Sequence, residues 1–481
     1  MFMRTPDRMI LSRRTFLGGT AGSALLAALP SRSAQGVTQG ATHDYRLALD
    51  TASAPLVGGT YPATDIWAYN GTVPGPEIRV PQGSRLRVAV ENKLAEATTV
   101  HWHGIRLPNA MDGVPFLTQT PIEPGDSFVY EFDVPDAGSY WYHPHQRSFE
   151  QVGRGLYGPL IVEERSPIQV DRDATWVLDD WRLQPNGQIS GDFGDFRDIA
   201  HGGRIGNTVT VNGRVPDTFA VRQGERLRLR LINAANARIF GLDFAGHHPM
   251  VIAIDGQPVE PHAPAGGLVV VAPAMRIDLV LDFMGQPGQR SAVADRFYER
   301  GAYHLLDLVY EPEPLRQASL ITPIALPSNT MPEPDMAAAE THAITFDGGM
   351  MGGLISAMMD HQRVSPQEMM RNNMAWSVNG VVATGHTMEP MLSLRRGQST
   401  ILALNNETAW HHPIHLHGHS FRVISRNGRP TAHREWQDTV LMAPRDKVEI
   451  AFVADNPGGW MFHCHILEHQ AGGMSGVIQV A

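Results

Sequence analysis

One segment occurs three times in this chain of 481 residues, and each copy has the same order of turn, strand and asparagine. The copies lie at residues 69–92, 211–233 and 378–406. Each copy has an Asn-Gly turn, then a glycine, and then an asparagine nine residues after that glycine. The three glycine–asparagine pairs are Gly83 and Asn92, Gly224 and Asn233, and Gly397 and Asn406.

The residues between each glycine and its asparagine alternate in polarity. In the second copy, Leu227, Leu229 and Leu231 alternate with arginines. This period of two is typical of a half-buried strand, with one face toward the core and one toward solvent. The chain also contains 47 Gly and 35 Pro, which favour short strands joined by turns over long helices. The sequence therefore predicts an all-β protein of three consecutive β-sandwich domains.

Each repeated segment marks one predicted domain. We name these domains unit one, unit two and unit three, and expect them to span residues 40–168, 169–312 and 340–481. The proline-rich stretch from Glu311 to Pro334 separates the second and third units. Unit three contains a methionine-rich insert at about residues 345–374.

The N-terminal segment has the pattern of an export signal. Arg13 and Arg14 are followed by a mildly apolar stretch from Gly18 to Leu29, which is too short to span a bilayer. We expect residues 1–34 to be a twin-arginine signal peptide that directs the protein to the periplasm or outside the cell, with no membrane anchor. The formal net charge of −10 is spread without long runs, so nothing indicates a nucleic-acid partner.

Paired histidines occupy matched positions in units one and three. Nine residues after the marker asparagine, unit one has His101 and His103, and unit three has His415 and His417. Further on, the units have a second pair each, which are His143 with His145 and His463 with His465. Unit two is apolar at the first of these offsets. We therefore expect units one and three to face each other with eight imidazoles between them.

A His-x-His pair on a strand points both imidazoles to the same side, so it presents two ligands to one metal. Imidazole binds copper, zinc, iron and nickel, and a single pair is weak support for any site. Cys464, the only cysteine, distinguishes these metals. Two histidines and a cysteine with a weak axial methionine form a blue-copper site, and His412, Cys464, His469 and Met474 supply that set.

Taken together, these motifs resemble the four copper motifs of three-domain multicopper oxidases. That family includes laccases, bacterial spore-coat oxidases and periplasmic cuprous oxidases, and the likeness runs from about residue 45 to residue 481. The resemblance implies cupredoxin-like Greek-key β-sandwich domains. It also implies a laccase-like reaction, in which phenols or other small donors lose single electrons and O₂ is reduced to water.

The same resemblance implies four copper ions, one of type 1, one of type 2 and two of type 3. Type 1 copper would be held by His412, Cys464, His469 and Met474. Type 2 copper would be held by His101 and His415. The type 3 pair would be held by His103, His143, His145, His417, His463 and His465. Unit two would hold no copper.

Proton supply is the next requirement, and Asp112 matches an acid that the family places near the copper cluster. An aspartate before a glycine is also an ordinary turn former. Several bacterial members have a carboxylate directly after the last type 1 histidine, whereas this chain has Gln470. An amide does not deliver a proton at neutral pH, so Asp112, Glu468 or water would do so.

The electron donor stays open. Residues 331–374 hold nine of the 21 methionines, which resembles the methionine-rich insert of cuprous oxidases. Thioether sulfur favours Cu(I), although methionine also fills irregular packing. Those oxidases place an aspartate and a methionine just before the type 1 histidine, where this chain has Thr408 and Trp410. The alternatives are a cuprous oxidase in copper tolerance and a non-catalytic cupredoxin scaffold of the cell envelope. The sequence does not give the oligomeric state.

Overall fold

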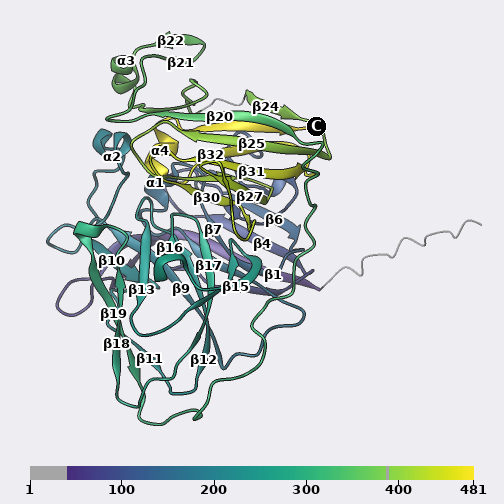
Figure 1. The fold of residues 1–481 in the computed structure, drawn as a ribbon. Helices are drawn as coiled ribbons and strands as arrows, with labels where there is room; N and C mark the ends of the chain where they lie inside the picture. The colour runs from purple at the N-terminus through teal and green to yellow at the C-terminus, as the bar shows by residue number, and fades with distance from the viewer. Residues whose placement is uncertain (1–40, 386–388) are drawn as a thin grey trace, which may run out of the picture. The chain divides into compact units, whose positions relative to one another are not determined.

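The structure, a computed structural model, describes residues 41–385 and 389–481. The predicted signal peptide, residues 1–34, lies outside them. The described chain consists mainly of strands with a few short helices, so the all-β prediction is confirmed (Figure 1). In these two ranges no helix has the length and apolarity needed to cross a membrane.

Unit one forms two four-stranded sheets, in the orders β2-β1-β4-β6 and β3-β8-β7-β5. Apolar side chains from both sheets pack between them. The strands are β1 (Thr42–Ala54), β2 (Thr64–Tyr69), β3 (Ile78–Pro81), β4 (Arg85–Asn92), β5 (His101–His103), β6 (Ser127–Asp133), β7 (Gly138–His143) and β8 (Gly158–Glu163), with helix α1 at Ser148–Gln151 and a 3₁₀ turn at Asn109–Met111.

Unit two forms sheets in the orders β10-β9-β12-β17-β14-β15 and β11-β19-β18-β13-β16. Its strands are β9 (Arg172–Trp181), β10 (Thr208–Val211), β11 (Thr218–Val221), β12 (Arg226–Asn233), β13 (Phe240–Phe244), β14 (Met250–Ile254), β15 (Gln257–His262), β16 (Val269–Val271), β17 (Arg276–Asp282), β18 (Arg290–Asp295) and β19 (Tyr303–Tyr310). Helix α2 (Phe196–Ala200) and 3₁₀ turns at Ala265–Gly267 and Glu299–Gly301 complete the unit.

Unit three forms one sheet in the order β23-β20-β25-β31-β27-β28, with β29 beside β27, and a second in the order β24-β33-β32-β26-β30. Its strands are β20 (Glu340–Gly348), β23 (Trp376–Val378), β24 (Pro390–Leu394), β25 (Gln398–Asn406), β26 (His412–Leu416), β27 (Phe421–Arg426), β28 (Arg429–Pro430), β29 (Trp436–Gln437), β30 (Thr439–Met442), β31 (Lys447–Ala454), β32 (Gly458–Cys464) and β33 (Ser475–Val480). The methionine-rich insert adds the hairpin β21 (Ala357–Met359) with β22 (Gln362–Val364) and helix α3 (Pro366–Arg371), and helix α4 (Leu467–Ala471) follows β32.

The three marker asparagines make the same buried contacts. Asn92, Asn233 and Asn406 each end a central strand, and each side-chain amide donates to a carbonyl across the unit at 2.8 Å. Each amide also donates to a carbonyl of the loop that follows it, four or five residues on, and each side-chain oxygen accepts from the backbone N–H two residues on. We call these contacts the asparagine clamps. In units one and three they hold the start of the loop that leads from the asparagine to the paired histidines.

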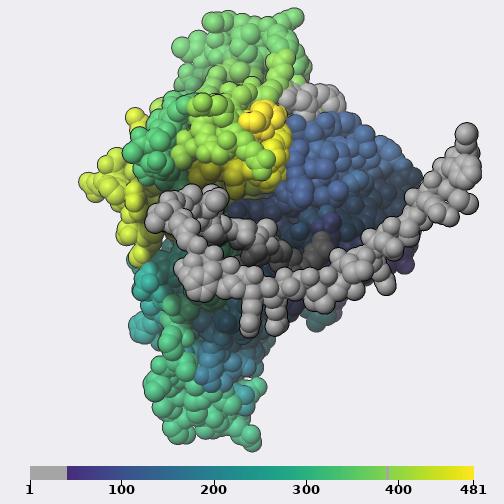
Figure 2. All heavy atoms as spheres, turned by 90° about the vertical axis from the view of Figure 1, so that its right-hand side faces the viewer, coloured from purple at the N-terminus to yellow at the C-terminus, as the bar shows by residue number. Residues whose placement is uncertain are grey.

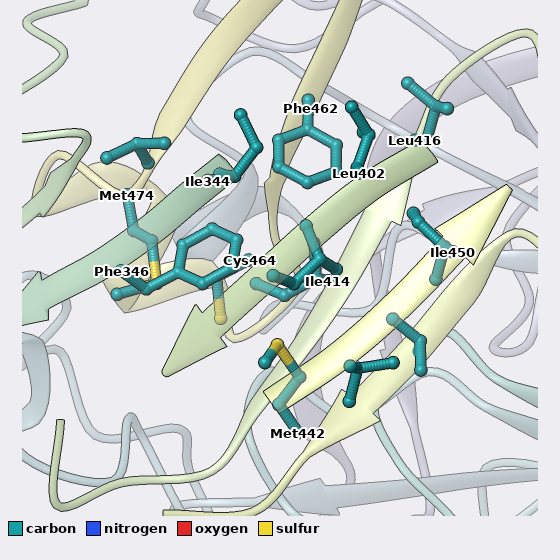
Figure 3. Packing of buried hydrophobic residues seen from close by; sticks show 14 of the residues in the cluster. Ile344, Phe346, Leu402, Ile414, Leu416, Met442, Ile450, Phe462, Cys464 and Met474 are labelled. Atoms are coloured by element: carbon teal, nitrogen blue, oxygen red, sulfur yellow. The ribbon is translucent and has the colours of Figure 1, made fainter. Parts of the chain in front are cut away.

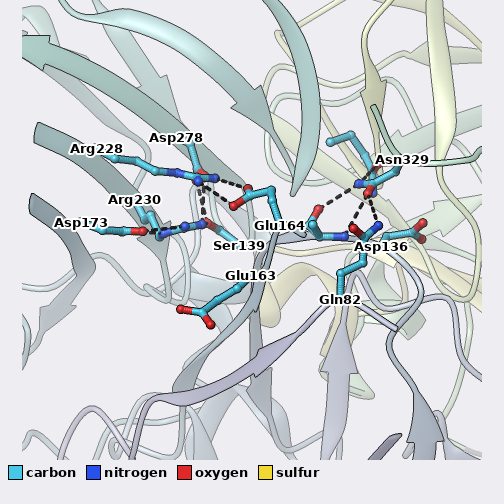
Figure 4. Close-up of polar contacts among 12 residues, drawn as sticks. Gln82, Asp136, Ser139, Glu163, Glu164, Asp173, Arg228, Arg230, Asp278 and Asn329 are labelled. Carbon is cyan, nitrogen blue, oxygen red and sulfur yellow. Dashed lines mark hydrogen bonds and ion pairs between the residues drawn. The ribbon is translucent and has the colours of Figure 1, made fainter. Parts of the chain in front are cut away.

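The prediction that β12 is half-buried is wrong. Its leucines face the core as predicted, but its arginines are buried as well: Arg228 is 2% exposed and Arg230 is 1% exposed. Arg228 forms ion pairs with Glu164 and Asp278, and Arg230 donates to Ser139 of unit one (Figure 4). The polar face of β12 is therefore covered by unit one instead of water, which period-two alternation does not reveal.

Units one and three are also in direct contact. The Asn109 amide donates to the Gly459 carbonyl at 2.7 Å, and the Asn456 amide donates to the Leu107 carbonyl at 2.9 Å. Figure 2 shows the blue atoms of unit one against the green and yellow atoms of unit three. This contact brings the histidine strands of the two units together.

Candidate metal centre

Strand pairing sets the positions of the paired histidines. In unit one, β5 and β7 are antiparallel, with His101 opposite His143. In unit three, β26 and β32 are antiparallel, with His415 opposite His463. Each unit therefore presents its two His-x-His pairs side by side, from neighbouring strands of one sheet.

The structure brings all eight of these histidines together in the interior. One triad is His103, His143 and His465, and a second is His145, His417 and His463; in each, the ligand atoms lie within 4.8 Å of one another. His101 and His415 form a third group with His103. Every group draws on both unit one and unit three, as the matched repeats predicted.

Most of these rings are oriented by a carbonyl or carboxylate behind them. The Nδ1 atoms of His101, His143, His415 and His463 donate to the carbonyls of Asp112, Pro144, Asp438 and Cys464 at distances of 2.7 to 3.0 Å. His417 Nδ1 donates to the Asp112 carboxylate at 2.8 Å. A ring whose Nδ1 carries the proton has a lone pair on Nε2, and the Nε2 atoms face the cluster.

His103 has the opposite orientation. Its Nε2 donates to Asp438 Oδ1 at 3.1 Å, so Nδ1 carries the lone pair. Burial raises the pKa of the Asp438 carboxyl, but the Arg276 guanidinium and the His415 ring together more than offset that effect and hold this pKa below its usual range. Asp438 is therefore an anion that accepts from His103.

Several buried ring nitrogens have no protein partner, and their chemistry fits a bound metal. They are His101 Nε2, His103 Nδ1, His143 Nε2, His145 Nε2, His415 Nε2 and both nitrogens of His465. An unpaired buried polar atom costs about 1–3 kcal/mol, so this concentration in one place needs a compensating ligand. Burial lowers the pKa of the imidazoles, which keeps them neutral and able to coordinate; this holds for His103, His143, His145, His415, His417, His463 and His465.

A second group lies within unit three. Cys464 Sγ is 3.5 Å from His412 Nδ1 and 3.6 Å from His469 Nδ1, and the two Nδ1 atoms are 3.1 Å apart. Burial raises the pKa of the Cys464 thiol and lowers that of His469 to about 3. Met474 is fully buried in the same apolar cluster, and Figure 3 shows its side chain near that of Cys464. A thiol, two neutral imidazoles and a thioether fit a copper ion that can displace the thiol proton.

Three contacts orient this second group. His412 Nε2 donates to Thr408 Oγ1 at 2.8 Å, and His469 Nε2 donates to the His201 carbonyl at 2.6 Å. The Trp376 ring packs against both imidazoles, with centroid distances of 5.1 and 4.4 Å. Both Nδ1 atoms are therefore left to face Cys464.

The predicted proton donor, Asp112, is buried between the units. Besides His417, its carboxylate lies 3.2 Å from His101 Nδ1, so it contacts a histidine of each unit. Gln470 lies near His145, with its amide nitrogen 3.5 Å from Nδ1. The Glu468 carboxylate is buried, which raises its pKa, and it accepts from the Asn236 side chain and the Arg204 backbone.

Some residues of the site were missed by the sequence analysis. Thr408 stands out in the sequence only as a departure from a family pattern, and no local motif marks Trp376 or Asp438. Asp438 immediately precedes β30, which pairs with β26. In that pair His415 lies opposite Thr439, which is 24 residues away in sequence. Arg276 was missed because an arginine on an alternating strand looks solvent-exposed.

The methionine-rich insert lines a cavity of about 240 Å³. The cavity is bounded by α2, by the loop after β20, and by five methionines, Met350, Met351, Met369, Met370 and Met374. Ala375 lines the same cavity, and its neighbour Trp376 contacts His412 and His469. The insert therefore lies close to the Cys464 group.

Family profiles described as multicopper oxidase match the chain in three places, at residues 52–167, 172–301 and 358–481. These matches together cover most of the chain, and each lies within one of the three predicted units.

Individual proteins give the same result. The multicopper oxidase MmcO of Mycobacterium tuberculosis is 32% identical, covering 98% of this chain and 96% of that protein. Laccase-1 of Botryotinia fuckeliana is 28% identical, covering 85% of this chain and 77% of that protein. The crystal structure of a multicopper oxidase from Pseudomonas thermotolerans is 35% identical with a TM-score of 0.79, covering 92% of this chain and 100% of that one.

Proposed function

The chain belongs to the multicopper oxidase family, and from that premise we propose that it is an exported laccase-like oxidase. It takes single electrons from phenolic or other small donors and reduces O₂ to water. The observation that carries the proposal is the pairing of a buried His-Cys-His group with eight converging imidazoles. The coarser statement, an oxidoreductase of this family that uses copper, follows from the family itself.

The two groups divide the copper ions between them. His412, Cys464 and His469, with Met474, would hold type 1 copper, and the eight remaining histidines would hold one type 2 and two type 3 ions. When bound, the four copper ions supply one-electron redox chemistry and together hold the four electrons that reduction of O₂ to two waters requires. The eight histidines are buried, each no more than 5% exposed.

Cys464 connects the two groups through the chain itself. Its neighbours His463 and His465 point into the eight-histidine cluster, while its sulfur lies beside His412 and His469. A path of few covalent bonds therefore runs from the donor side to the O₂ side. Asp112 would hold and deliver protons, because its carboxylate reaches both His101 and His417.

The test is to load the protein with copper and record its visible absorption and its O₂ uptake with a phenol. We expect a blue protein, and we expect Cys464→Ser to abolish the colour and the activity while most of the fold is kept. A copper-loaded wild type without strong absorption of red light would remove the type 1 assignment.

A second candidate function is a cuprous oxidase in copper tolerance, with Cu(I) as the donor. The methionine-lined cavity beside Trp376 favours it, because thioether sulfur is a soft ligand that binds Cu(I). The departure at Thr408 and Trp410 from the pattern of known cuprous oxidases favours the laccase-like function.

Comparing the two donors on one variant separates these functions. Replacing Met350, Met351, Met370 and Met374 with leucine keeps the volume of the cavity lining and removes the sulfur. Loss of Cu(I) oxidation with preserved phenol oxidation supports the cuprous role, and unchanged Cu(I) kinetics removes it. Met284→Leu, an exposed methionine of unit two, is the control.

Export by the twin-arginine route is part of the proposal and has its own test. Changing Arg13 and Arg14 to lysine should keep the protein in the cytoplasm. Fractionation of cells that produce the wild type and the variant measures this, and equal export of both would remove the route. The full ligand set argues against a non-catalytic envelope scaffold.

A further inference from the structure

Unit two carries no ligand of the candidate copper groups, yet it contacts the eight-histidine cluster through one buried ion pair. Arg276, the first residue of β17, is 0% exposed and pairs with Asp438 of unit three, which is 1% exposed. Asp438 in turn accepts from His103 of unit one. The ion pair is thus the meeting point of all three units.

The Arg276 guanidinium is fixed in one orientation. Its Nη1 donates to Asp438 Oδ1 at 2.9 Å, and its Nη2 donates to Asp438 Oδ2. Its Nε donates to the Ser139 carbonyl at 3.1 Å, and Nη1 also donates to the Ala274 carbonyl at 3.1 Å. A bidentate arginine–carboxylate pair with these extra bonds holds the plane of the carboxylate.

A second residue of unit two holds the backbone around Asp438. Asp255 Oδ2 accepts from the backbone N–H groups of Asp438 and Thr439 at 3.2 and 3.0 Å. Its Oδ1 accepts from the Arg276 backbone N–H at 3.0 Å. Asp255 therefore connects strand β17, which begins at Arg276, to the segment of unit three that contains Asp438.

Asp438, held by Arg276 and Asp255, in turn orients two imidazoles. Its carboxylate orients His103 with Nδ1 toward the cluster, the reverse of the neighbouring rings, and its carbonyl accepts from His415 Nδ1 at 2.8 Å. The residue after His103 makes room for the ion pair. Gly104 has φ 86°, and a Cβ there would lie 2.3 Å from Arg276 Nη2 and 2.6 Å from Asp438 Oδ2.

We propose that Arg276 and Asp255 of unit two are positioning residues for the copper cluster, which act through Asp438 on the ring orientation of His103 and His415. The inference rests on the proposed function, because it assumes that the cluster holds copper. It assigns to the ligand-free middle unit a part in building the cluster between its two neighbours.

The competing explanation is that Arg276 only stabilises the fold, as any buried ion pair would. Arg230 on the adjacent strand β12 is the matched control. It is 1% exposed, it pairs with Asp173 and Asp278, and it donates to the Ser139 hydroxyl; none of these three partners bonds to an imidazole (Figure 4). Losing the arginine fork geometry at either position should lower stability, but only one position should change the cluster.

The experiment compares Arg276→Lys and Arg230→Lys with the wild type, all copper-loaded. The measurements are copper content after competition with a chelator, the electron paramagnetic resonance signal of type 2 copper, the red-light absorption of type 1 copper, and the unfolding temperature. We expect both variants to unfold at lower temperature. Only Arg276→Lys should lose the type 2 signal and bind cluster copper at least about 10-fold more weakly, with its blue colour kept.

Asp255→Asn is a second variant for the case in which Arg276→Lys does not fold. Asparagine tolerates the left-handed backbone at this position, where φ is 48°, but its amide cannot accept the three N–H bonds that the carboxylate accepts. We expect the same selective weakening of the cluster.

The outcomes are distinct. Cluster copper retained by Arg276→Lys, or by Asp255→Asn, as well as by Arg230→Lys overturns the inference. Equal losses in the Arg230 and Arg276 variants reduce Arg276 to a stabilising residue and overturn it too. A wild type that binds no cluster copper overturns the proposed function instead.

Discussion

At the scale of single residues, the candidate ligands are held by partners that fix which nitrogen carries the proton. Thr408 is the clearest case, because it is 0% exposed and its hydroxyl donates to Asn406 Oδ1 at 2.8 Å. Its oxygen is therefore oriented to accept from His412 Nε2, and His412 Nδ1 is left unprotonated toward Cys464.

Thr408→Ala removes this acceptor. We expect it to bind type 1 copper about 10-fold more weakly, since the loss of a partner behind a metal-bound histidine typically costs at least that much. Titration of the blue absorption against a copper chelator measures the affinity. Thr408→Ser keeps the hydroxyl and should retain wild-type affinity; an equal loss in both variants would assign the effect to the methyl group and not to the hydrogen bond.

Asp112→Asn replaces the proposed proton donor with an amide of the same shape. Asparagine still accepts from His417 but cannot release a proton, so we expect O₂ reduction to slow by about 100-fold while copper content is unchanged. O₂ uptake at saturating donor is the measurement. Normal turnover in the variant would transfer the proton role to another group.

At the scale of elements, the asparagine clamps fix the loops between strands. Each clamp bonds two carbonyls and one backbone N–H in the interior. In unit three the clamped loop carries Thr408 and leads to His412, whereas in unit two it carries no ligand. The asparagine clamp therefore supports the fold in unit two, and it supports both the fold and the candidate site in unit three.

Asn233→Ala and Asn406→Ala test this division. Each leaves buried carbonyls without a donor, so we expect the free energy of unfolding to fall by about 2–4 kcal/mol in both. Chemical denaturation of the metal-free proteins measures it. Only Asn406→Ala should also weaken the blue absorption of the copper-loaded protein; a similar loss in Asn233→Ala would contradict the division.

Strand periodicity was enough to predict the all-β fold, and the matched His-x-His pairs were enough to group the eight histidines. The residues of the Cys464 group were predicted instead from the ligand set of blue-copper sites. Periodicity was not enough for the polar faces, because alternation reports which residues face one way and not what covers them. Arg228 and Arg230 looked like a solvated face and lie under unit one. Asp438 and Arg276 are 162 residues apart, and no local pattern links them.

At the scale of the whole molecule, units one and three supply the cluster, and unit two holds the Asp438 carboxylate behind it. Asn109 and Asn456 join units one and three at the surface of contact, and the eight imidazoles fill its interior. A metal bound there would join the two units through its ligands, in addition to these hydrogen bonds.

Removal of copper should therefore lower the thermal stability of the protein. A ligand at about 100 times its Kd stabilises the native state by about 2.7 kcal/mol for each site, so the metal-free protein should unfold several degrees lower. Calorimetry before and after treatment with a chelator measures the shift, and re-addition of copper should reverse it. An unchanged unfolding temperature would mean that the metal does not bind the folded state preferentially.

The division of ligands between the units also sets an order of events. The protein ligands of the Cys464 group all come from unit three, whereas each triad of the cluster needs unit one in place as well. In the proposed enzyme, the Cys464 group could therefore bind its copper without unit one, whereas the cluster could bind copper only once units one and three are in contact. We therefore expect the blue colour to appear before the ability to consume oxygen when copper is added to the metal-free protein.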